Sequence, residues 1–151
     1  MTVQWREKMT IDDGVIDQDH RHLIDIINRF ENAAKDGLTL SEGLEILFAL
    51  KFYASTHFKR EEQLQRLIDF PFYDSHKREH EELIEKLSQI IDELKMSQES
   101  SYNTVARHTA VLLREWLVDH VLHSDLRMKV FVDALRDQGR DMKALSSILS
   151  E

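Results

Sequence analysis

Histidines and a glutamate occupy positions that helical spacing assigns to a protein interior. In the stretch HFKREE, His57 and Glu61 stand four residues apart, and in HKREH the same spacing separates His76 and His80. Residues four apart on a helix are offset by about 40° and one turn, so the two side chains can reach one ion or two adjacent ions. Imidazole and carboxylate together suit iron, manganese or zinc. These pairs are compatible with a metal site, although one pair alone would be weak evidence for it.

The composition leaves few alternatives to this ligand chemistry. The 151 residues include no cysteine, which excludes disulfides, thiolate metal sites, cysteine-ligated iron–sulfur clusters and thiol nucleophiles. The net charge of −8, with scattered lysines and arginines, argues against nucleic acid as a partner. No apolar run approaches the roughly 18 residues of a transmembrane helix, and the N-terminus lacks a hydrophobic signal region. We expect a cytoplasmic protein that does not interact with membranes.

Four segments with helical periodicity must position the histidines. The chain is 42% apolar and 32% charged with one proline and four glycines, which favours an all-α fold. Apolar residues recur three and four apart in each segment, and no segment alternates like a strand. Short connections predict an up-down-up-down antiparallel four-helix bundle. The predicted helices cover about 18–36, 41–68 with Ser41 as N-cap, 74–97, and 103 onward with a continuation or kink toward Leu135.

Two smaller segments flank this bundle. Residues 1–15 should form an irregular arm whose Trp5, Met9 and Ile11 pack across the helices. A short C-terminal helix should follow Gly139 and end near Leu149. The chain length suits one domain over 1–151, with the bundle at about 18–137.

Counting from the turns puts four histidines at one level of the bundle. His20 and His57 lie 18 and 19 residues from a turn near residue 38, and His80 and His120 lie 19 and 21 residues from a turn near residue 99. At about 1.5 Å per residue these separations are about 27 to 32 Å. A buried layer of imidazoles and carboxylates without a cation would be unfavourable, because ionised carboxylates resist desolvation. Five histidines together with carboxylates able to bridge suggest two ions rather than one.

Two common metal motifs are missing from the chain. No candidate histidine has a glutamate three residues before it, as the ferritin-like di-iron bundles do. The zinc-protease pattern H-E-x-x-H is also absent, since lysine follows His76 in HKREH. The ligand set therefore differs from both of these classes.

At these residues the chain resembles the hemerythrins, specifically their single-domain bacterial form, over about residues 5–137. The resembling motifs are VIDQDHRHL with His20, HFKREE with His57 and Glu61, HKREH with His76 and His80, and WLVDHVLHSD with Trp116, His120 and Asp125.

This resemblance implies a non-haem di-iron centre, with two Fe ions per chain and an oxo or hydroxo bridge between them. The implied ligands are His76, His80 and His120 on one iron and His20 and His57 on the other, with Glu61 and Asp125 bridging both. The two-histidine iron would keep one open position, and dioxygen would bind there. The implied oxygen pocket is lined by Trp116 and Leu122, with Phe58 packed beside the cluster.

Asp125 does not fit this arrangement on an ideal helix. It stands five residues after His120, about 140° around a regular α-helix, whereas His123 would lie closer to the inward stripe. A bulge with i to i+5 hydrogen bonds would bring Asp125 back toward the metals. We therefore predict a distortion between Trp116 and Leu126. The remaining histidines, His22, His108 and His123, have no place in the pattern. His22 lies about 200° from His20 on an ideal helix and is expected at the surface.

Three functions are compatible with such a centre. Reversible dioxygen binding, for carriage, storage or sensing, is the leading hypothesis, and the protein is then not an enzyme. Apolar walls, the lack of cysteine and the lack of an evident proton relay beside the metals would slow cleavage of the O–O bond. The second hypothesis is a di-iron enzyme with ferroxidase, peroxidase-like or nitric-oxide-handling activity. The third is a structural or storage site for zinc or manganese. No protein partner is indicated.

Overall fold

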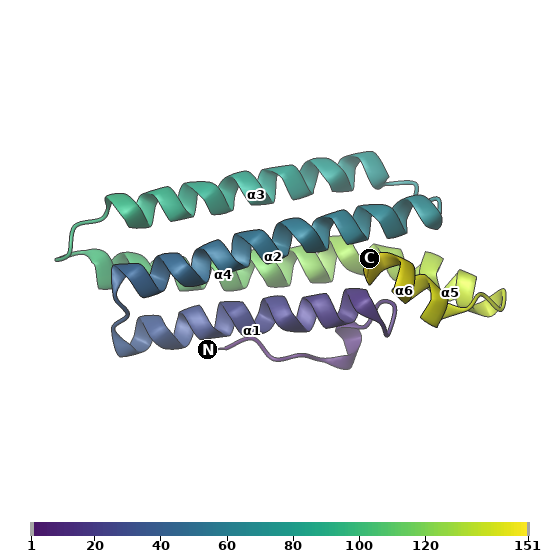
Figure 1. The fold of residues 1–151 in the computed structure, drawn as a ribbon, viewed down its shortest axis with the longest axis horizontal. Helices are drawn as coiled ribbons and strands as arrows, with labels where there is room; N and C mark the ends of the chain where they lie inside the picture. The colour runs from purple at the N-terminus through teal and green to yellow at the C-terminus, as the bar shows by residue number, and fades with distance from the viewer. Residues whose placement is uncertain (1, 151) are drawn as a thin grey trace.

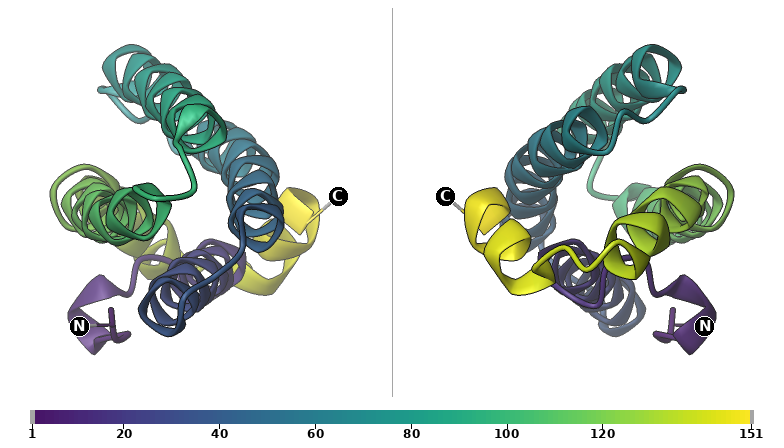
Figure 2. Two further views of the ribbon diagram at one scale, coloured as in Figure 1. Left: turned by 90° about the vertical axis from the view of Figure 1, so that its left-hand side faces the viewer. Right: turned by 90° about the vertical axis from the view of Figure 1, so that its right-hand side faces the viewer.

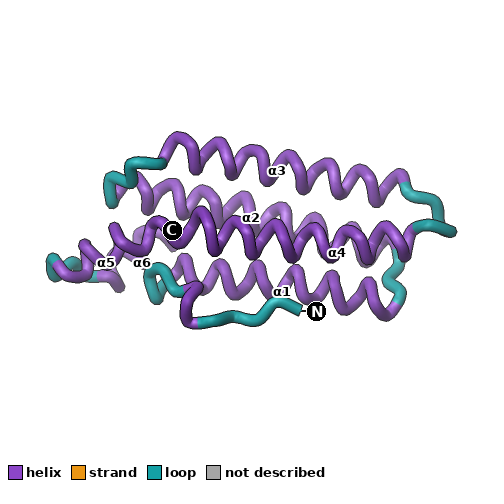
Figure 3. Tube along the Cα trace, turned by 180° about the vertical axis from the view of Figure 1, so that it is seen from behind, coloured by secondary structure: helices purple, strands orange, loops and turns teal. Residues whose placement is uncertain are grey.

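Four long helices run alternately up and down in the computed structural model, which describes residues 2–150 (Figure 1). They are α1 (Val15–Asp36), α2 (Leu40–Leu67), α3 (Tyr73–Met96) and α4 (Tyr102–Asp119). The described part of the chain contains helices and loops but no strand (Figure 3), so the predicted all-α bundle is confirmed. Residues 1 and 151, at the ends of the expected arm and domain, lie outside the described residues.

The four helices form a ring when seen along the bundle (Figure 2). Helix α2 packs against α1 on one side and α3 on the other, and α4 packs mainly against α1 and more sparsely against α3. Each helix can therefore direct one face toward a common interior. None of the helices in residues 2–150 is long and apolar enough to cross a lipid bilayer.

Helix α2 begins earlier than its sequence indicated. The predicted N-cap Ser41 is wrong, because Thr39 holds this position in extended backbone geometry and its hydroxyl accepts the Glu42 N–H at 3.2 Å. Either residue type can cap a helix, and only the backbone conformation decides between them. The predicted break after this helix is confirmed, since α2 ends at Leu67 and Asp69 has a φ of 50° just before Pro71.

Helix α1 also starts upstream of the predicted residue 18. The buried carboxylate of Asp12 accepts the backbone N–H groups of Gly14, Ile16 and Asp17 at 2.9 to 3.1 Å. These groups have no partner within the helix at its first turn. Asp12 therefore stabilises a helix start at Val15, before the apolar stripe becomes visible in the sequence.

The fourth helix continues past α4 through a change of helix type. A π-helical turn, η2 (His120–Ser124), is followed by a 3₁₀ segment, η3 (Asp125–Met128), and then by α5 (Lys129–Asp137). Gly139, with a φ of 79°, ends this run, and α6 (Met142–Ser150) returns to pack on α1 and α2. The predicted distortion and the predicted C-terminal helix are both confirmed.

The N-terminal arm packs on the bundle, as predicted, but runs along α1 instead of across the helices (Figure 3). It contains one short 3₁₀ turn, η1 (Glu7–Met9), and its Met9 and Ile11 side chains are buried while Trp5 is half-buried. Asn28 of α1 holds the arm, because its side chain accepts the Val3 N–H and donates to the Val3 carbonyl, both at 2.8 Å.

The apolar interior is divided into two clusters. The larger cluster fills the length of the bundle and includes Leu23 of α1 and Ala54 of α2. The smaller cluster gathers Ile16, Leu64 and residues of η3, α5 and α6 at one end. On α1, His20 stands between Ile16 and Leu23, and on α2 the candidate ligands lie between Ala54 and Leu64. A polar layer thus separates the two clusters.

Candidate metal centre

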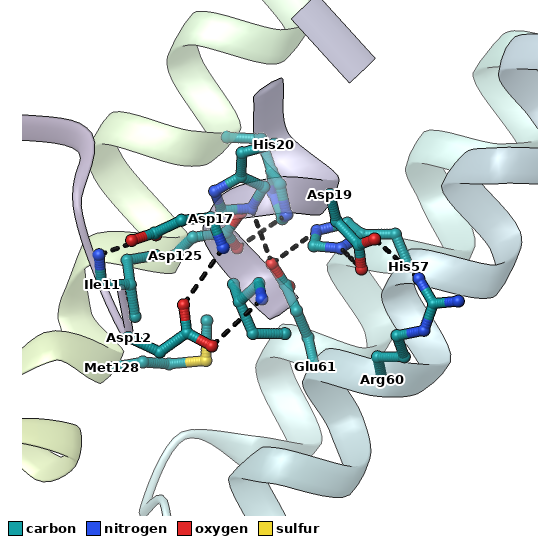
Figure 4. A network of polar contacts seen from close by, with 12 residues as sticks. Ile11, Asp12, Asp17, Asp19, His20, His57, Arg60, Glu61, Asp125 and Met128 are labelled. Atoms are coloured by element: carbon teal, nitrogen blue, oxygen red, sulfur yellow. Dashed lines mark hydrogen bonds and ion pairs between the residues drawn. The ribbon is translucent and has the colours of Figure 1, made fainter. Parts of the chain in front are cut away.

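The structure brings all seven predicted ligands into this polar layer. His20 comes from α1, His57 and Glu61 from α2, His76 and His80 from α3, His120 from the start of η2 and Asp125 from the start of η3. None of them is more than 5% exposed. Figure 4 shows His20, His57, Glu61 and Asp125 directed toward one another.

The ligand atoms form two groups that share both carboxylates. One group contains His76, His80 and His120, the other contains His20 and His57, and Glu61 and Asp125 belong to both. Within each group the potential ligand atoms lie within 4.8 Å of one another. We call these the three-histidine position and the two-histidine position.

Each carboxylate divides its two oxygens between the two positions. Glu61 directs Oε2 at the Nε2 atoms of His76 and His80, at 3.3 and 3.0 Å, and Oε1 at those of His20 and His57, at 3.0 and 2.7 Å. Asp125 directs Oδ1 at the Nε2 atoms of His76 and His120, at 3.0 and 2.9 Å, and Oδ2 at that of His20, at 3.0 Å. This is the geometry of two carboxylates that can bridge two cations.

Three of the five histidines are held from behind by a further carboxylate. The Nδ1 atom of His57 lies 2.9 Å from Asp19, that of His80 lies 2.9 Å from Glu62, and that of His120 lies 3.0 Å from Glu79. An ionised carboxylate only accepts hydrogen bonds, so each imidazole donates its Nδ1–H. We call Asp19, Glu62 and Glu79 the outer carboxylates. They fix the tautomer in which Nε2 carries a lone pair toward the interior.

These contacts test whether the site suits a cation. With Nδ1 protonated, Nε2 of His57 and Nε2 of His120 each carry a lone pair directed at a carboxylate oxygen. Both atoms of each contact are then hydrogen-bond acceptors, and no proton lies between them. His57 Nε2, His120 Nε2 and both Asp125 oxygens are in fact buried without a hydrogen-bond partner. Unpartnered buried acceptors are unfavourable, and a cation at each position would take a lone pair from every one of these atoms. The residues present fit a metal ion.

The electrostatics of the layer show how tightly these groups interact. Burial lowers the pKa of His20, but the nearby Asp125 and Glu61 carboxylates outweigh it and raise that pKa to about 10. The same opposing effects raise the pKa of His76 to about 9. Burial raises the pKa of Glu61, yet the surrounding histidines bring it well below its ordinary value. A metal ion therefore competes with protons for the imidazole nitrogens.

The π-helical turn explains how Asp125 reaches the centre. Within η2 the chain carries one more residue per turn than an α-helix, and the Asp125 N–H bonds the carbonyl of His120, five residues earlier. Asp125 is consequently fully buried, whereas His123 turns outward and its side chain is 75% exposed. A regular helix would reverse these two orientations.

Aromatic side chains form the wall between the centre and the larger apolar cluster. The Phe58 ring stacks on the His80 imidazole, with centroids 4.0 Å apart and planes at 6°, and meets the edge of His120. Trp116 is buried 6.4 Å from Phe58 between ring centroids. Leu122 is half-buried and packs against the same cluster. The assignment of these three residues to an oxygen pocket stays a prediction.

A solvent-facing cleft of about 610 Å³ lies between α3 and α4. Glu79, Trp116, His120 and His123 are among its lining residues. The pKa of Glu79 is lowered to about 2, chiefly by the hydrogen bond with His120. Acidic groups thus contact the ligands from outside, which corrects the expectation that nothing able to relay a proton stands beside them. Of the other unassigned histidines, His22 is exposed as predicted, and His108 is exposed as well.

The outer carboxylates were missed by reasoning from the sequence, although a signal was present. Asp19 directly precedes His20, Glu62 directly follows Glu61, and Glu79 directly precedes His80. A residue adjacent to an inward ligand is rotated by about 100° and so faces the neighbouring helix. Each outer carboxylate accordingly serves a histidine on the next helix of the bundle.

An antiparallel four-helix bundle with two positions bridged by carboxylates and completed by histidines defines a class of non-haem metal-binding proteins. Within that class, the family described as Hemerythrin HHE cation binding domain matches residues 13–143. The chain belongs to this hemerythrin family.

Several relatives share most of the chain at low identity. A bacteriohemerythrin from Stenotrophomonas maltophilia is 26% identical over 121 residues, which cover 80% of this chain and 75% of the relative. A bacteriohemerythrin from Pseudomonas aeruginosa is 26% identical over 132 residues, covering 87% and 80%. A third, from Clostridium acetobutylicum, is 26% identical over 125 residues, covering 80% and 94%. The family, these names and the buried ligand cluster support a metal-binding, oxygen-related function.

Proposed function

We propose that the protein binds dioxygen reversibly at a di-iron centre, for carriage, storage or sensing. In this proposal the three-histidine and two-histidine positions would each hold one iron, with Glu61 and Asp125 available as ligands to both and an oxo or hydroxo group between the irons, as the resemblance implies. The irons would supply the electrons and the binding position for dioxygen. A cytoplasmic location, expected from the sequence, belongs to the same proposal.

One observation carries the proposal. Glu61 and Asp125 each direct one oxygen at the histidines of one position and the other oxygen at those of the second. This arrangement supports two cations held close together, and it supplies three imidazoles to one cation and two to the other. Both cations share the same two carboxylates, so the position with two imidazoles has the smaller number of protein ligands. The unequal ligand count supports an external ligand binding at the two-histidine position.

The protein side chains around the centre have two roles in this function. The outer carboxylates hold His57, His80 and His120 with their Nε2 lone pairs directed inward. The apolar wall of Phe58, Trp116 and Leu122 keeps water from the ligand layer on the side of the larger cluster. Restricting water on that side would limit irreversible oxidation of the irons by bound dioxygen.

The test is optical. The protein is loaded with iron, reduced without oxygen, exposed to air and then returned to an oxygen-free atmosphere. We expect two irons per chain and an absorption band that forms in air and disappears when oxygen is removed. His120→Ala should abolish the band, whereas His123→Ala, which removes an exposed histidine three residues away, should not. Irreversible oxidation of the unaltered chain, or one iron per chain, contradicts the proposal.

A di-iron enzyme is the second candidate, and the cleft between α3 and α4 favours it. Glu79 is 39% exposed at its side chain, lines this cleft and contacts His120 directly. A carboxylate between solvent and a ligand could deliver protons for the reduction of peroxide or nitric oxide. Consumption of either substrate over many turnovers, and its loss in Glu79→Gln, would support the enzyme. A stable oxygenated form without turnover supports the binding protein.

A further inference from the structure

Asp19 differs from the other outer carboxylates in the number and charge of its partners. Its Oδ2 faces Nδ1 of His57 at 2.9 Å, while its Oδ1 accepts the Tyr53 hydroxyl and an Arg60 N–H, both at 2.6 Å (Figure 4). The Asp19 carboxylate is only 2% exposed, and the Arg60 side chain is 24% exposed. Among the three outer carboxylates, Asp19 alone forms an ion pair with an arginine in the described residues.

Asp19 and Arg60 have opposite effects on the strength of His57 as a metal ligand. A carboxylate that accepts the Nδ1–H increases the electron density of the imidazole and makes its Nε2 a stronger ligand. The Arg60 guanidinium, bound to the other oxygen, withdraws part of that negative charge. The Tyr53 hydroxyl does the same more weakly because it is a neutral donor. Burial and the bond to Asp19 raise the pKa of Tyr53 to about 12, so the phenol keeps its proton.

Within residues 2–150, the two-histidine position has no other support of this kind. The second imidazole there, His20, is fully buried and its Nδ1 has no hydrogen-bond partner. The remaining outer carboxylates, Glu62 and Glu79, contact His80 and His120 of the three-histidine position. The outer charge that reaches the two-histidine position through a ligand histidine therefore comes through Asp19.

We propose that Asp19, Tyr53 and Arg60 form a clamp that positions His57 and sets its ligand strength, and that the clamp acts on the two-histidine position alone. None of the three is a metal ligand, and each acts through His57. The inference rests on the proposed function, because it specifies which end of the centre is tuned. It assigns Arg60 a role opposite in sign to that of Asp19.

The first experiment measures metal affinity without dioxygen. Cobalt(II) is titrated into the metal-free chain of 151 residues, and the two binding steps are followed by visible absorption and calorimetry. Loss of a hydrogen-bonding partner behind a ligand histidine typically weakens metal affinity by about 10- to 100-fold. Asp19→Asn should weaken one of the two binding steps by this factor. Glu62→Gln, the matched control at His80, should weaken the other step instead.

Two results of that titration overturn the clamp. Asp19→Asn could leave both affinities within about twofold of the unaltered chain, or it could weaken both steps equally. Either result shows that Asp19 does not control metal affinity at the two-histidine position alone. Circular dichroism checks that each variant keeps its helices, and Arg60→Gln, which alters a partly exposed residue, provides a second variant if Asp19→Asn fails to fold.

The second experiment measures the reduction potential of each variant and compares the directions in which it shifts. In the iron-loaded protein, a weaker His57 ligand favours the reduced metal, so Asp19→Asn should raise the reduction potential. Arg60→Gln should lower it, Tyr53→Phe should lower it less, and Arg60→Lys should stay near the unaltered value. A tenfold change in relative affinity for the two oxidation states corresponds to 59 mV for one electron. A merely structural role predicts shifts of the same sign for Asp19→Asn and Arg60→Gln, and that result also overturns the proposal.

The clamp and the proposed function can fail separately. If the cobalt titrations distinguish Asp19→Asn from Glu62→Gln but the iron protein does not bind dioxygen reversibly, the clamp is supported and the function is wrong. If dioxygen binding is reversible but the two variants weaken the same step, the clamp is wrong and the function stands.

Discussion

Asp125 Oδ1 lies 2.9 Å from His120 Nε2, although the two residues are five apart on one continuous helical segment. A regular α-helix would place them about 140° apart around its axis. The π-helical turn His120–Ser124 removes this offset by adding one residue to the turn between them. The ligand set of the fourth helix therefore depends on a backbone irregularity as well as on residue identity.

Changing the number of residues in that turn tests this dependence. Deleting the exposed His123 leaves Asp125 four residues after His120, the spacing of His57 and Glu61, so a regular α-helix then keeps Asp125 in the layer and metal content should be retained. Inserting one alanine after His123 instead leaves Asp125 six residues after His120, about 240° around an α-helix, and metal content should fall below one ion per chain while circular dichroism still shows a helical protein. His123→Ala keeps the chain length and should bind metal normally. Full metal content after the insertion, or its loss after the deletion, contradicts this account of the turn.

Glu61→Gln should affect both positions together. Its two oxygens face histidines of different positions, so a neutral amide weakens the ligand set of each. We expect both cobalt-binding steps to weaken by at least tenfold. His80→Ala, which removes a ligand from one position, should weaken one step more than the other. Glu45→Gln changes an exposed glutamate of the same helix and serves as the control, with affinities equal to those of the unaltered chain.

Removing the metal should lower the thermal stability of the protein. A ligand present at about 100 times its dissociation constant stabilises the folded state by about 2.7 kcal/mol. For a chain of this size, about 1 kcal/mol shifts the melting temperature by roughly 2 to 4 °C. Chelation should therefore lower the melting temperature by several degrees, as measured by calorimetry, and added zinc should restore it. An unchanged melting temperature would show that the metal does not stabilise the fold.

Metal binding should release protons, and its affinity should rise with pH. In the metal-free chain the pKa of His20 is raised to about 10 and that of His76 to about 9, so both are protonated at neutral pH. Because each pKa lies above the ordinary value of about 6.5, the stability that these protonated histidines contribute is complete below pH 6.5. It is lost as the pH rises through about 9 to 10, over which range metal binding becomes easier. Calorimetry in buffers of different ionisation enthalpy measures the released protons, and zero release contradicts this prediction.

Phe58→Leu should shorten the lifetime of an oxygenated iron protein. Phe58 stacks on His80 and is 3% exposed, so the smaller side chain leaves space beside the ligand layer. Water entering that space should accelerate irreversible oxidation severalfold, as followed by absorption in air. Phe52→Leu removes an aromatic ring that is 76% exposed on the same helix, and its oxidation rate should not change. Equal oxidation rates in both variants would show that Phe58 does not protect the oxygen pocket from water.

The long-range arrangement of this centre was predictable because helical rise and turn positions are regular. Counting residues from two turns placed His20 level with His57 and His80 level with His120, and the structure brings all four into one buried layer. The distortion before Asp125 was predictable for the same reason, since a regular helix could not satisfy the implied ligand set.

Other features depend on local geometry that a spacing pattern does not contain. The choice of Thr39 over Ser41 as N-cap follows from the backbone conformation of the connection. The start of α1 depends on Asp12, whose contacts lie outside the apolar stripe. The outer carboxylates resemble ordinary surface acids in sequence, and only the packing of adjacent helices brings each of them against a histidine.

The division of the apolar interior predicts a mechanical role for a bound cation. The end cap formed by η3, α5 and α6 packs with the adjoining ends of α1 and α2 in the smaller cluster, and the layer of seven candidate ligands lies between that cluster and the larger one. A cation bound in this layer would link side chains from all four helices of the bundle. Its loss should weaken the connection between the two clusters, so the stability of the C-terminal cap should indicate whether the centre is filled.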